Sequence, residues 1–181
     1  MTETTDGLVD GVADRAAPVL LRRARTADVR GIKTLVDSFA DDNILLRKPL
    51  VTLYETVQEF RVAVRGRHVV GCGALHVLWE DLAEIRTIAV DPVMQGAGIG
   101  HGLVHELLAQ ARALGLRSVF VLTFEVAFFE QHGFREIEGS PVSPDVYAEM
   151  MQSADEGVAE FLDLAYVKPN TLGNTRMLLD L

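Results

Sequence analysis

The spacing in this chain that is most informative about chemistry is Gln-x-x-Gly-x-Gly at Gln95–Gly100, with Gly96 as an additional glycine. An apolar run, Ile85–Val90, precedes this segment and predicts a strand, and a stretch with helical periodicity follows it. Glycines tolerate positive φ and let a ligand approach the backbone N–H groups. Because the first-turn N–H groups of a helix lack internal partners and carry the positive end of its dipole, the pattern predicts a socket for a phosphate-bearing ligand.

Two other nucleotide-binding motifs are excluded by this spacing. The P-loop requires a lysine after its last glycine, and no lysine follows Gly100. The dinucleotide fingerprint requires Gly-x-Gly-x-x-Gly near the start of a βαβ fold, whereas Gly96-x-Gly98-x-Gly100 lies in the middle of this chain. The segment between Val93 and Gly100 holds no Lys or Arg, so binding would depend on N–H groups and the helix dipole. A tight strand-to-helix turn without a ligand is the alternative.

Length and composition favour one globular domain with a sizeable core. The chain has 181 residues, of which 49% are hydrophobic, and this fraction argues against disorder. No apolar run approaches the ~20 residues of a membrane span, and the N-terminus does not resemble a signal peptide. The net charge of −9 disfavours nucleic-acid binding, which needs a basic face. We therefore expect a cytoplasmic protein without a membrane or nucleic-acid partner.

Cys72 is the one cysteine of the chain, so an internal disulfide is excluded, as is usual in a reducing compartment. It lies in an expected strand, which favours a buried structural thiol over a nucleophile. We expect no metal cofactor.

The order of expected elements is that of a single α/β domain at 19–181, preceded by a disordered tail at 1–18 that is polar, acidic and aperiodic. The third helix has the clearest apolar face, and Gly115 is its expected C′ residue. That face comprises Ile99, Leu103, Val104, Leu107, Leu108 and Ala111. Strands are expected at 19–23, 61–64, 69–78, 83–90, 118–122, 134–137, 161–167 and 176–181. Helices are expected from Thr26 as N-cap to Phe39, from a capping box at Thr52–Glu55 to Phe60, and at 98–114, 126–132 and 145–152.

The glycine-rich segment resembles the coenzyme A pyrophosphate loop of the GNAT family of N-acetyltransferases, and the element order is similar to that of the family. The resemblance implies an α/β (α+β) GNAT acyl-CoA N-acyltransferase fold, with a mixed central sheet of about seven strands flanked by helices. It also implies that the strands ending at Val90 and Leu122 splay apart and admit the acetyl-pantetheine arm of acetyl-CoA, the expected co-substrate. The cofactor-binding residues implied are Ile88, Ala89, Val90, Gln95, Gly96, Ala97, Gly98, Ile99, Gly100 and Phe129.

A second motif, Phe128–Phe134, resembles the Phe-Tyr-x-x-x-Gly-Phe segment that packs beside the coenzyme arm in this family. Many members carry a tyrosine at the position of Phe129, where it protonates the leaving thiolate. Since Phe129 has no proton to give, another donor, a water chain or direct loss of thiolate must serve here. An amphipathic helix end capped by Gly133 is a compatible reading of the same residues.

Two residues of the strand before the loop are candidates for catalysis. Strand alternation places Glu84, Arg86 and Ile88 on one face unless a bulge intervenes. Glu84 matches the position of the base in histone acetyltransferases of the superfamily, and a base is useful because the attacking amine, with a pKa of about 8 or higher, must be neutral. A structural ion pair is the alternative role for Glu84, and His76 is a second candidate base. The backbone N–H of Ala89 or its neighbour is expected to stabilise the thioester oxyanion.

Four segments, at 43–48, 83–86, 166–170 and 173–178, resemble short-form amino-acid N-acetyltransferases, the N-acetylglutamate synthases that start arginine biosynthesis. The resemblance covers about residues 20–181 and implies acetylation of the α-amine of L-glutamate or L-glutamine. Because glutamate has two carboxylates, its site needs cationic or amide donors from separate places. The candidates are Lys48, Arg86, Lys168, Asn174, Thr175 and Arg176.

Alternatives to this substrate assignment stay open. Each candidate cation could be a solvated surface charge, and either Arg47 or Lys48 could face the substrate. The chain could also be a GNAT enzyme for another small amine or a protein N-terminus, or a non-catalytic acetyl-CoA sensor. Because GNAT domains often dimerise, we expect a homodimer.

Overall fold

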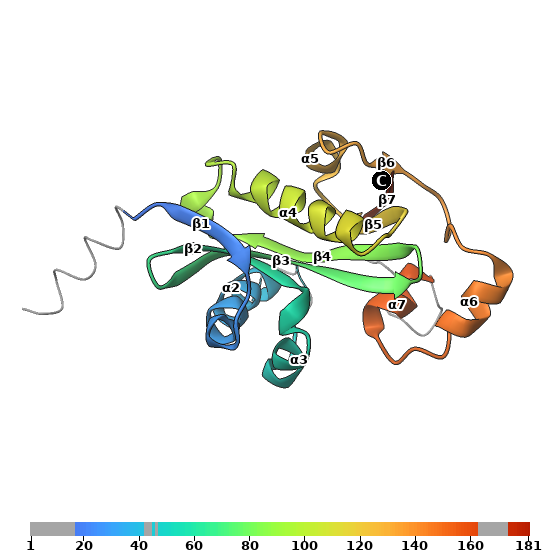
Figure 1. Ribbon diagram of the computed structural model, residues 1–181, viewed down its shortest axis with the longest axis horizontal. Coiled ribbons are helices and arrows are strands. Elements are labelled where there is room, and N and C mark those ends of the chain that lie inside the picture. Colours follow the sequence, from blue (N-terminus) through green and yellow to red (C-terminus); the bar gives the residue numbers. More distant parts are fainter. Residues whose placement is uncertain (1–16, 42–44, 46, 163–173) are drawn as a thin grey trace, which may run out of the picture. The chain divides into compact units, whose positions relative to one another are not determined.

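Seven strands form one mixed sheet in the computed structural model, which describes residues 17–41, 45, 47–162 and 174–181. The strands are hydrogen-bonded in the order β1-β2-β3-β4-β5-β7-β6 (Figure 1). The expected mixed sheet of about seven strands flanked by helices is therefore confirmed. Contacts group the chain into two compact units, Met1–Leu75 with Ile85–Gln110, and His76–Glu84 with Ala111–Leu181.

The first unit begins with an antiparallel meander of β1 (Val19–Arg23), β2 (Phe60–Arg65) and the first part of β3 (His68–Trp79). The expected hairpin turn joins β2 to β3, with Gly66 at a φ of 57°. One side chain in two along β2 faces α2 (Val29–Asp41), as strand periodicity requires. The core on this side consists of Val29, Ile32, Leu35, Val36, Leu53, Phe60, Val62, Val64, Cys72, Ala74 and Ala89.

The two N-cap predictions for this unit are wrong. Thr26 lies inside a 3₁₀ turn, η1 (Thr26–Asp28), and the capping position is Arg25, whose N–H donates to the Asp28 carboxylate at 2.7 Å. The expected capping box at Thr52–Glu55 lies within α3 (Leu50–Glu55), whose N-cap is Pro49. The helix also ends before Phe60: a 3₁₀ turn, η2 (Val57–Glu59), follows, and Phe60 opens β2. Phe60 is buried as a strand residue, so its apolar spacing from Leu53 does not reflect a continuous helix.

The other side of the same strands carries α4 (Ile99–Ala113), which follows β4 (Leu82–Val90) and the 3₁₀ turn η3 (Pro92–Met94). Figure 1 shows α4 on the opposite side of β1–β3 from α2 and α3. The close approach of α4 to the strands depends on glycine. A Cβ on Gly71 of β3 would lie 3.0 Å from Ile99 of α4, and a Cβ on Gly102 of α4 would lie 2.7 Å from Leu21 of β1. All six residues of the predicted apolar face of α4 are buried, and Gly115 has the positive φ, 79°, of a C′ residue, as predicted.

The second unit contains β5 (Ser118–Thr123) and β7 (Thr175–Asp180), paired antiparallel, with β6 (Arg135–Glu136) on the far side of β7. β4 pairs in parallel with β5 at Leu82–Glu84 and Ser118–Phe120. The described part of this unit also contains three short helices: α5 (Val126–Glu130), α6 (Pro144–Met150) and α7 (Glu156–Phe161). Its core comprises Leu78, Leu82, Phe120, Met150, Val158, Phe161, Leu162 and Leu178.

The predicted start of one strand of the second unit is wrong. Phe161, the expected first residue of a strand at 161–167, is the last residue of α7. Its ring packs edge-on against Phe120, with the ring centroids 4.9 Å apart. The apolar side chain therefore belongs to the core at the point where α7 ends. The remainder of that predicted strand from 163 onward lies outside the described residues, as do residues 1–16 of the predicted tail.

Candidate functional site

The glycine-rich loop is held at its entrance by backbone and carboxylate hydrogen bonds. The N–H of Asp91, just after β4, donates to the carbonyl of Val70 at 2.9 Å, which ties the end of β4 to β3. The Asp91 carboxylate accepts from the N–H of Val93 at 3.0 Å, and Pro92 occupies the first position of η3. Because these contacts fix the backbone just after β4, the glycine-rich loop leaves the strand in a defined direction.

Gly96 and Gly98 have positive φ, 79° and 77°, as the sequence predicted for a loop of this kind. A Cβ built on either residue would meet nothing within 4 Å, so the glycines are required by backbone conformation and not by crowding inside the protein. The segment from Gln95 to Gly98 is exposed, and the N–H of Gly102 donates to the carbonyl of Gly98 at 3.0 Å as α4 begins. The first-turn N–H groups of α4 therefore point out of the helix end, where an anion can be bound.

β4 contains a backbone irregularity at Thr87, whose φ is +60° although its side chain is β-branched. Such a conformation is rare for a branched residue and costs about 1–3 kcal/mol. The buried Cys72 thiol lies 3.6 Å from the Thr87 carbonyl oxygen and donates to it. Burial raises the pKa of the Cys72 thiol to about 12, and the predicted burial of this cysteine in a strand is confirmed.

The side chains that follow the irregularity face opposite sides of the sheet. Ala89 packs in the core beside α2, whereas Ile88 reaches toward Gly73 and Leu107, on the side of α4. This is the alternation of a regular strand, so the departure from regular geometry in β4 is the positive φ of Thr87.

Arg86 is held by a carboxylate that the sequence analysis missed. Its Nη2 donates to Oε2 of Glu59 at 3.3 Å, and both side chains are largely buried, with exposed fractions of 11% and 17%. Glu59 ends η2, whereas Arg86 lies on β4, so no local pattern in the sequence connects them.

The two candidate bases lie in the second unit. Glu84 is buried, with an exposed fraction of 4%, on the part of β4 that pairs with β5. Nε2 of His76 lies 3.8 Å from Oδ2 of Asp155, and both side chains are half-buried. Glu84 is therefore removed from bulk water, and His76 is partly removed from it.

Phe129 is buried within an aromatic group at the end of α5. Its ring makes edge contacts with Phe128 and Phe134, with centroids 5.1 and 5.3 Å apart. Gly133 follows with a φ of 88°, as expected for the cap of a short helix. Because the Phe129 ring has no hydroxyl, any proton must be donated by another group.

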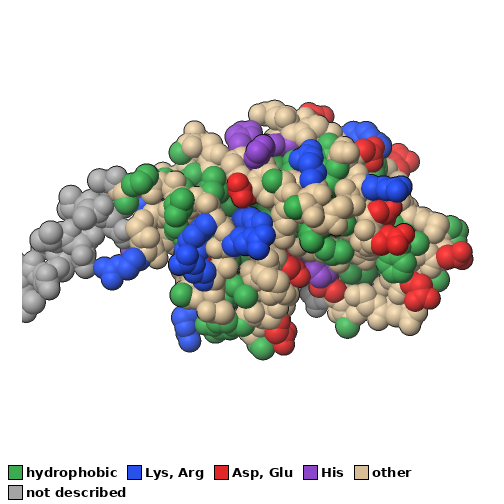
Figure 2. All heavy atoms as spheres, viewed as in Figure 1, with side chains coloured by type: hydrophobic (Ala, Val, Ile, Leu, Met, Phe, Trp, Pro, Cys, Tyr) green, Lys and Arg blue, Asp and Glu red, His purple; other side chains and the backbone are tan. Residues whose placement is uncertain are grey.

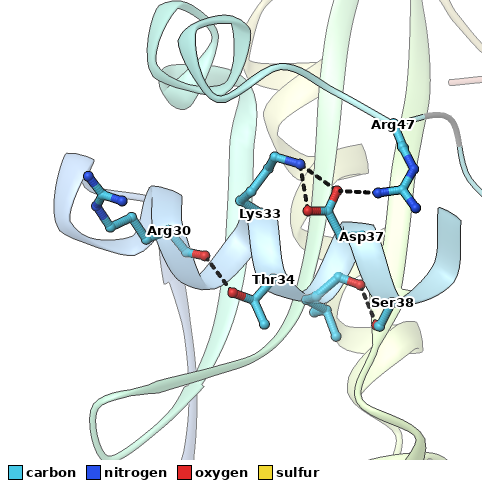
Figure 3. Close-up of polar contacts among 7 residues, drawn as sticks. Arg30, Lys33, Thr34, Asp37, Ser38 and Arg47 are labelled. Carbon is cyan, nitrogen blue, oxygen red and sulfur yellow. Dashed lines mark hydrogen bonds and ion pairs between the residues drawn. The ribbon is translucent and has the colours of Figure 1, made fainter. Parts of the chain in front are cut away.

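Arg47 and Lys48 precede α3 and differ in exposure. The side chain of Arg47 is 62% exposed and its Nη1 lies 4.0 Å from the Asp37 carboxylate, whereas Lys48 is half-buried. Figure 3 shows Arg47 and Lys33 pointing at Asp37 from opposite sides, and Lys33 Nζ lies 2.5 Å from both carboxylate oxygens. Asp37 therefore shares its charge between two cations on this surface.

The candidates near the C-terminus lie at the start of β7. Asn174, Thr175 and Arg176 are half-buried. Nε of Arg176 donates to the carbonyl of Gly139 at 3.1 Å, Nη2 donates to the carbonyl of Phe161, and the guanidinium lies 5.0 Å from the centroid of the Phe120 ring. Arg176 thus fixes the end of α7 to the sheet. The remaining candidate, Lys168, lies outside the described residues.

A groove of about 500 Å³ that the sequence did not predict adjoins the start of the loop in the first unit. One wall is the face of α2 with Gly31, Thr34 and Ser38, whose small side chains leave space. The lining residues are Ala27, Asp28, Gly31, Thr34, Leu35, Ser38, Arg67, His68, Val69, Asp91 and Pro92.

Cations are conspicuous on the visible face of this acidic chain. Figure 2 shows Lys and Arg side chains gathered around β1, where Arg23 and Arg25 are exposed.

Within the described ranges, no group of three or more His, Cys, Asp or Glu is placed to hold a metal ion. None of the helices in the described part of the chain has both the length and the apolar character of a membrane span.

Comparison with known proteins gives one family match and close relatives. The profile of the Acetyltransferase (GNAT) family matches residues 32–134. A protein of Mycobacterium tuberculosis (strain ATCC 25618 / H37Rv) named amino-acid acetyltransferase is 65% identical over 164 residues, 88% of this chain and 93% of the relative.

Solved structures agree with this match. A crystal structure from Mycobacterium tuberculosis, in complex with CoA and NLQ, has a TM-score of 0.86 at 65% identity and covers 90% of this chain and 99% of that chain. An N-acetylglutamate synthase from Neisseria gonorrhoeae, complexed with coenzyme A and N-acetyl-glutamate, has a TM-score of 0.71 at 22% identity. That second match covers 91% of this chain and 35% of the other, and it shows the fold alone.

Proposed function

Since this chain belongs to the acetyltransferase (GNAT) family, we propose that it transfers the acetyl group of acetyl-CoA to the α-amine of L-glutamate, with L-glutamine as the alternative acceptor. It is an acyltransferase of the amino-acid acetyltransferase type, and acetyl-CoA is its co-substrate. The observation that carries the proposal is 65% identity to an amino-acid acetyltransferase over 88% of the chain. The proposed place of the reaction is the first step of arginine biosynthesis.

The cofactor is assigned to the loop and to the strand before it. Backbone amides of Gln95–Gly100 and the N-terminal dipole of α4 hold the diphosphate, supported by the positive φ of Gly96 and Gly98. The backbone of Ile88, Ala89 and Val90 pairs with the pantetheine amides, as an added strand would. Phe129 provides apolar surface beside the coenzyme arm.

The chemistry is direct transfer within a ternary complex. The neutral amine attacks the thioester carbonyl carbon, a C–N bond forms, and the C–S bond then breaks to release coenzyme A as a thiolate. The N–H of Ala89 stabilises the oxyanion, and one such donor contributes roughly 3 kcal/mol to lowering the barrier. Glu84 accepts the proton from the amine, with His76 as the alternative base. Because Phe129 has no hydroxyl, water or direct thiolate loss completes the reaction.

The amino acid is assigned to cations and amides from separate elements. Arg86 meets the γ-group of the substrate from β4, where Glu59 holds it. Lys48 approaches from the segment before α3 and is preferred to Arg47, whose side chain is the more exposed and lies near Asp37. The remaining proposed contacts come from Lys168, Asn174, Thr175 and Arg176.

The test is a thiol-release assay with purified protein, acetyl-CoA and either L-glutamate or L-glutamine. We expect release of coenzyme A above background with at least one of them, and an acetylated amino acid identified by mass spectrometry. A polyamine and a peptide with a free N-terminus are the comparison acceptors. Release with those alone would reassign the substrate class, and cofactor binding without release on any amine would leave a sensor.

A further inference from the structure

The backbone at Thr87 is held in an unfavourable conformation next to the segment assigned to the pantetheine. Within the described part of the chain, Thr87 is the only residue other than glycine with a positive φ, +60°. A side chain branched at Cβ rarely adopts this conformation unless surrounding contacts hold it there. Thr87 is buried, with an exposed fraction of 8%, and it directly precedes Ile88. The contacts that hold Thr87 therefore also set the direction in which β4 continues.

One of these contacts comes from the neighbouring strand β3. Cys72 is fully buried, and its Sγ donates to the carbonyl oxygen of Thr87 at 3.6 Å. The thiol belongs to the same core cluster as Ala89, two residues beyond Thr87, so packing holds it against this part of β4. A carbonyl oxygen and the next N–H lie in one rigid peptide plane. A donor that holds the Thr87 oxygen therefore holds the whole peptide between Thr87 and Ile88.

The direction of that peptide plane determines where the N–H of Ile88 points. In a trans peptide the C=O and N–H bonds point in opposite directions. Because the Thr87 carbonyl accepts from Cys72, the N–H of Ile88 points away from this thiol. The ladder between β4 and β5 covers Leu82–Glu84 of β4, so Ile88 lies beyond it.

We propose that Cys72 is a positioning residue for acetyl-CoA: its thiol holds the peptide between Thr87 and Ile88 so that the N–H of Ile88 is aimed at the pantetheine arm. The inference rests on the proposed function, in which the backbone of Ile88–Val90 pairs with that arm. A donor that is held in place before the ligand arrives loses little freedom on binding, and this favours affinity. Cys72 itself contacts neither substrate and takes no part in the chemistry.

The experiment measures acetyl-CoA binding by calorimetry in the wild-type protein, in Cys72→Ala and in Cys72→Ser. We expect Cys72→Ala to weaken binding by about tenfold, which corresponds to the loss of one well-placed hydrogen bond. The KM for the amino acid should stay within about twofold of the wild-type value, because the peptide faces the cofactor. Cys72→Ser keeps a hydroxyl donor and should recover most of the affinity. Were Cys72→Ser to bind as weakly as Cys72→Ala, the positioning role would be overturned.

The matched control is Val62→Ala on β2. Val62 lies opposite Cys72 in the register of β2 and β3, is fully buried and belongs to the same core cluster. We expect this variant to lower the melting temperature while acetyl-CoA affinity stays within about twofold of wild type. An equal loss of affinity in Val62→Ala and Cys72→Ala would reduce the role of Cys72 to packing. A wild-type protein that binds acetyl-CoA but acetylates neither amino acid would instead refute the proposed substrate.

A second measurement needs no variant and stays informative if Cys72→Ala does not fold. Cys72 is the one cysteine of the chain, so its S–H stretching band in the infrared spectrum overlaps with no other thiol of the protein. Hydrogen bonds in a chain polarise one another. We therefore expect this band to shift on saturation with desulfo-CoA, an analogue that retains the pantetheine amides but has no thiol. An unchanged band would overturn the proposal, because the peptide that accepts from Cys72 would then be uncoupled from the cofactor.

Discussion

Gly73 of β3 leaves the space that Ile88 of β4 occupies: a Cβ on Gly73 would come within 2.4 Å of Ile88 Cδ1 and 3.1 Å of Leu107 Cδ1. The strand assigned to the pantetheine is thus matched in shape to β3 beside it in the sheet and to α4, which packs on the face of the sheet. Because interiors are closely packed, a single added methyl group at this point must displace a neighbour.

We therefore expect Gly73→Ala to reduce the free energy of unfolding by about 1–3 kcal/mol. The displaced Ile88 should also disturb the backbone of β4 and weaken acetyl-CoA binding. Urea denaturation measures the first effect, and calorimetric titration of acetyl-CoA measures the second.

The chain offers a compensating change for this variant. Ile88→Val removes Cδ1, the atom that the new methyl group would meet at 2.4 Å. The double variant should be more stable than the sum of the two single effects predicts, by at least about 0.5 kcal/mol. Simple additivity would show that Ile88 is not the group displaced.

Gly98→Ala is predicted to weaken acetyl-CoA binding by about tenfold while costing about 1–2 kcal/mol of stability, the usual penalty for a Cβ at positive φ. The loss of affinity arises because the backbone must leave the conformation that aims its N–H groups at the diphosphate. Calorimetry and thermal unfolding are the two measurements.

The control is Gly115→Ala at the other end of α4. Gly115 has the same φ as Gly96, 79°, and a Cβ there would also meet nothing within 4 Å. We expect a similar stability loss with unchanged acetyl-CoA affinity. If both variants weakened binding equally, the loop would have no special role in holding the diphosphate.

Acid sensitivity is predicted at the start of α2. The Arg22 guanidinium, bonded to both carboxylate oxygens of Asp28 at 2.7 and 2.9 Å, lowers the pKa of Asp28 below its ordinary value. A lowered folded-state pKa contributes stability above the unfolded-state value of about 4, and this contribution is lost as the pH falls through the folded-state value. The stability difference between wild type and Asp28→Asn should therefore be constant near neutrality and shrink in acid. A difference that persisted through the acid range would contradict the assignment.

Cys72 should resist thiol reagents in the folded protein. Its side chain is fully buried and burial raises its pKa to about 12, so almost no thiolate is present near neutral pH. We expect an aromatic disulfide reagent to label it only in denaturant, with one equivalent released. Rapid labelling of the native protein would show that β3 and β4 open readily around Thr87.

Elements defined by neighbouring residues were predictable from the sequence. The apolar face of α4, the turn at Gly66, the positive φ of Gly96 and Gly98, and the cap at Gly115 all depend on covalent neighbours within one or two turns. The phosphate socket could therefore be expected from spacing alone, because its donors are consecutive backbone groups.

Contacts between distant residues were not predictable in this way. The sequence contained Arg86 and Glu59, but only the sheet order β2-β3-β4, with η2 ending at the start of β2, brings them to 3.3 Å. In the same way, the sequence predicts a strand residue at Phe161, whereas the residue ends α7 and packs on Phe120, and the hydrogen bonds of Arg176 to the carbonyls of Gly139 and Phe161 follow from no local pattern.

The sequence by itself thus determined the loop, the helix behind it and the class of ligand they suit, since local periodicity and backbone chemistry act over a few residues. The tertiary structure alone decided which charges face one another and where β4 departs from regular geometry at Thr87. The reason is physical: a side-chain ion pair or a strained φ is stable only when packing from remote segments holds both partners in place.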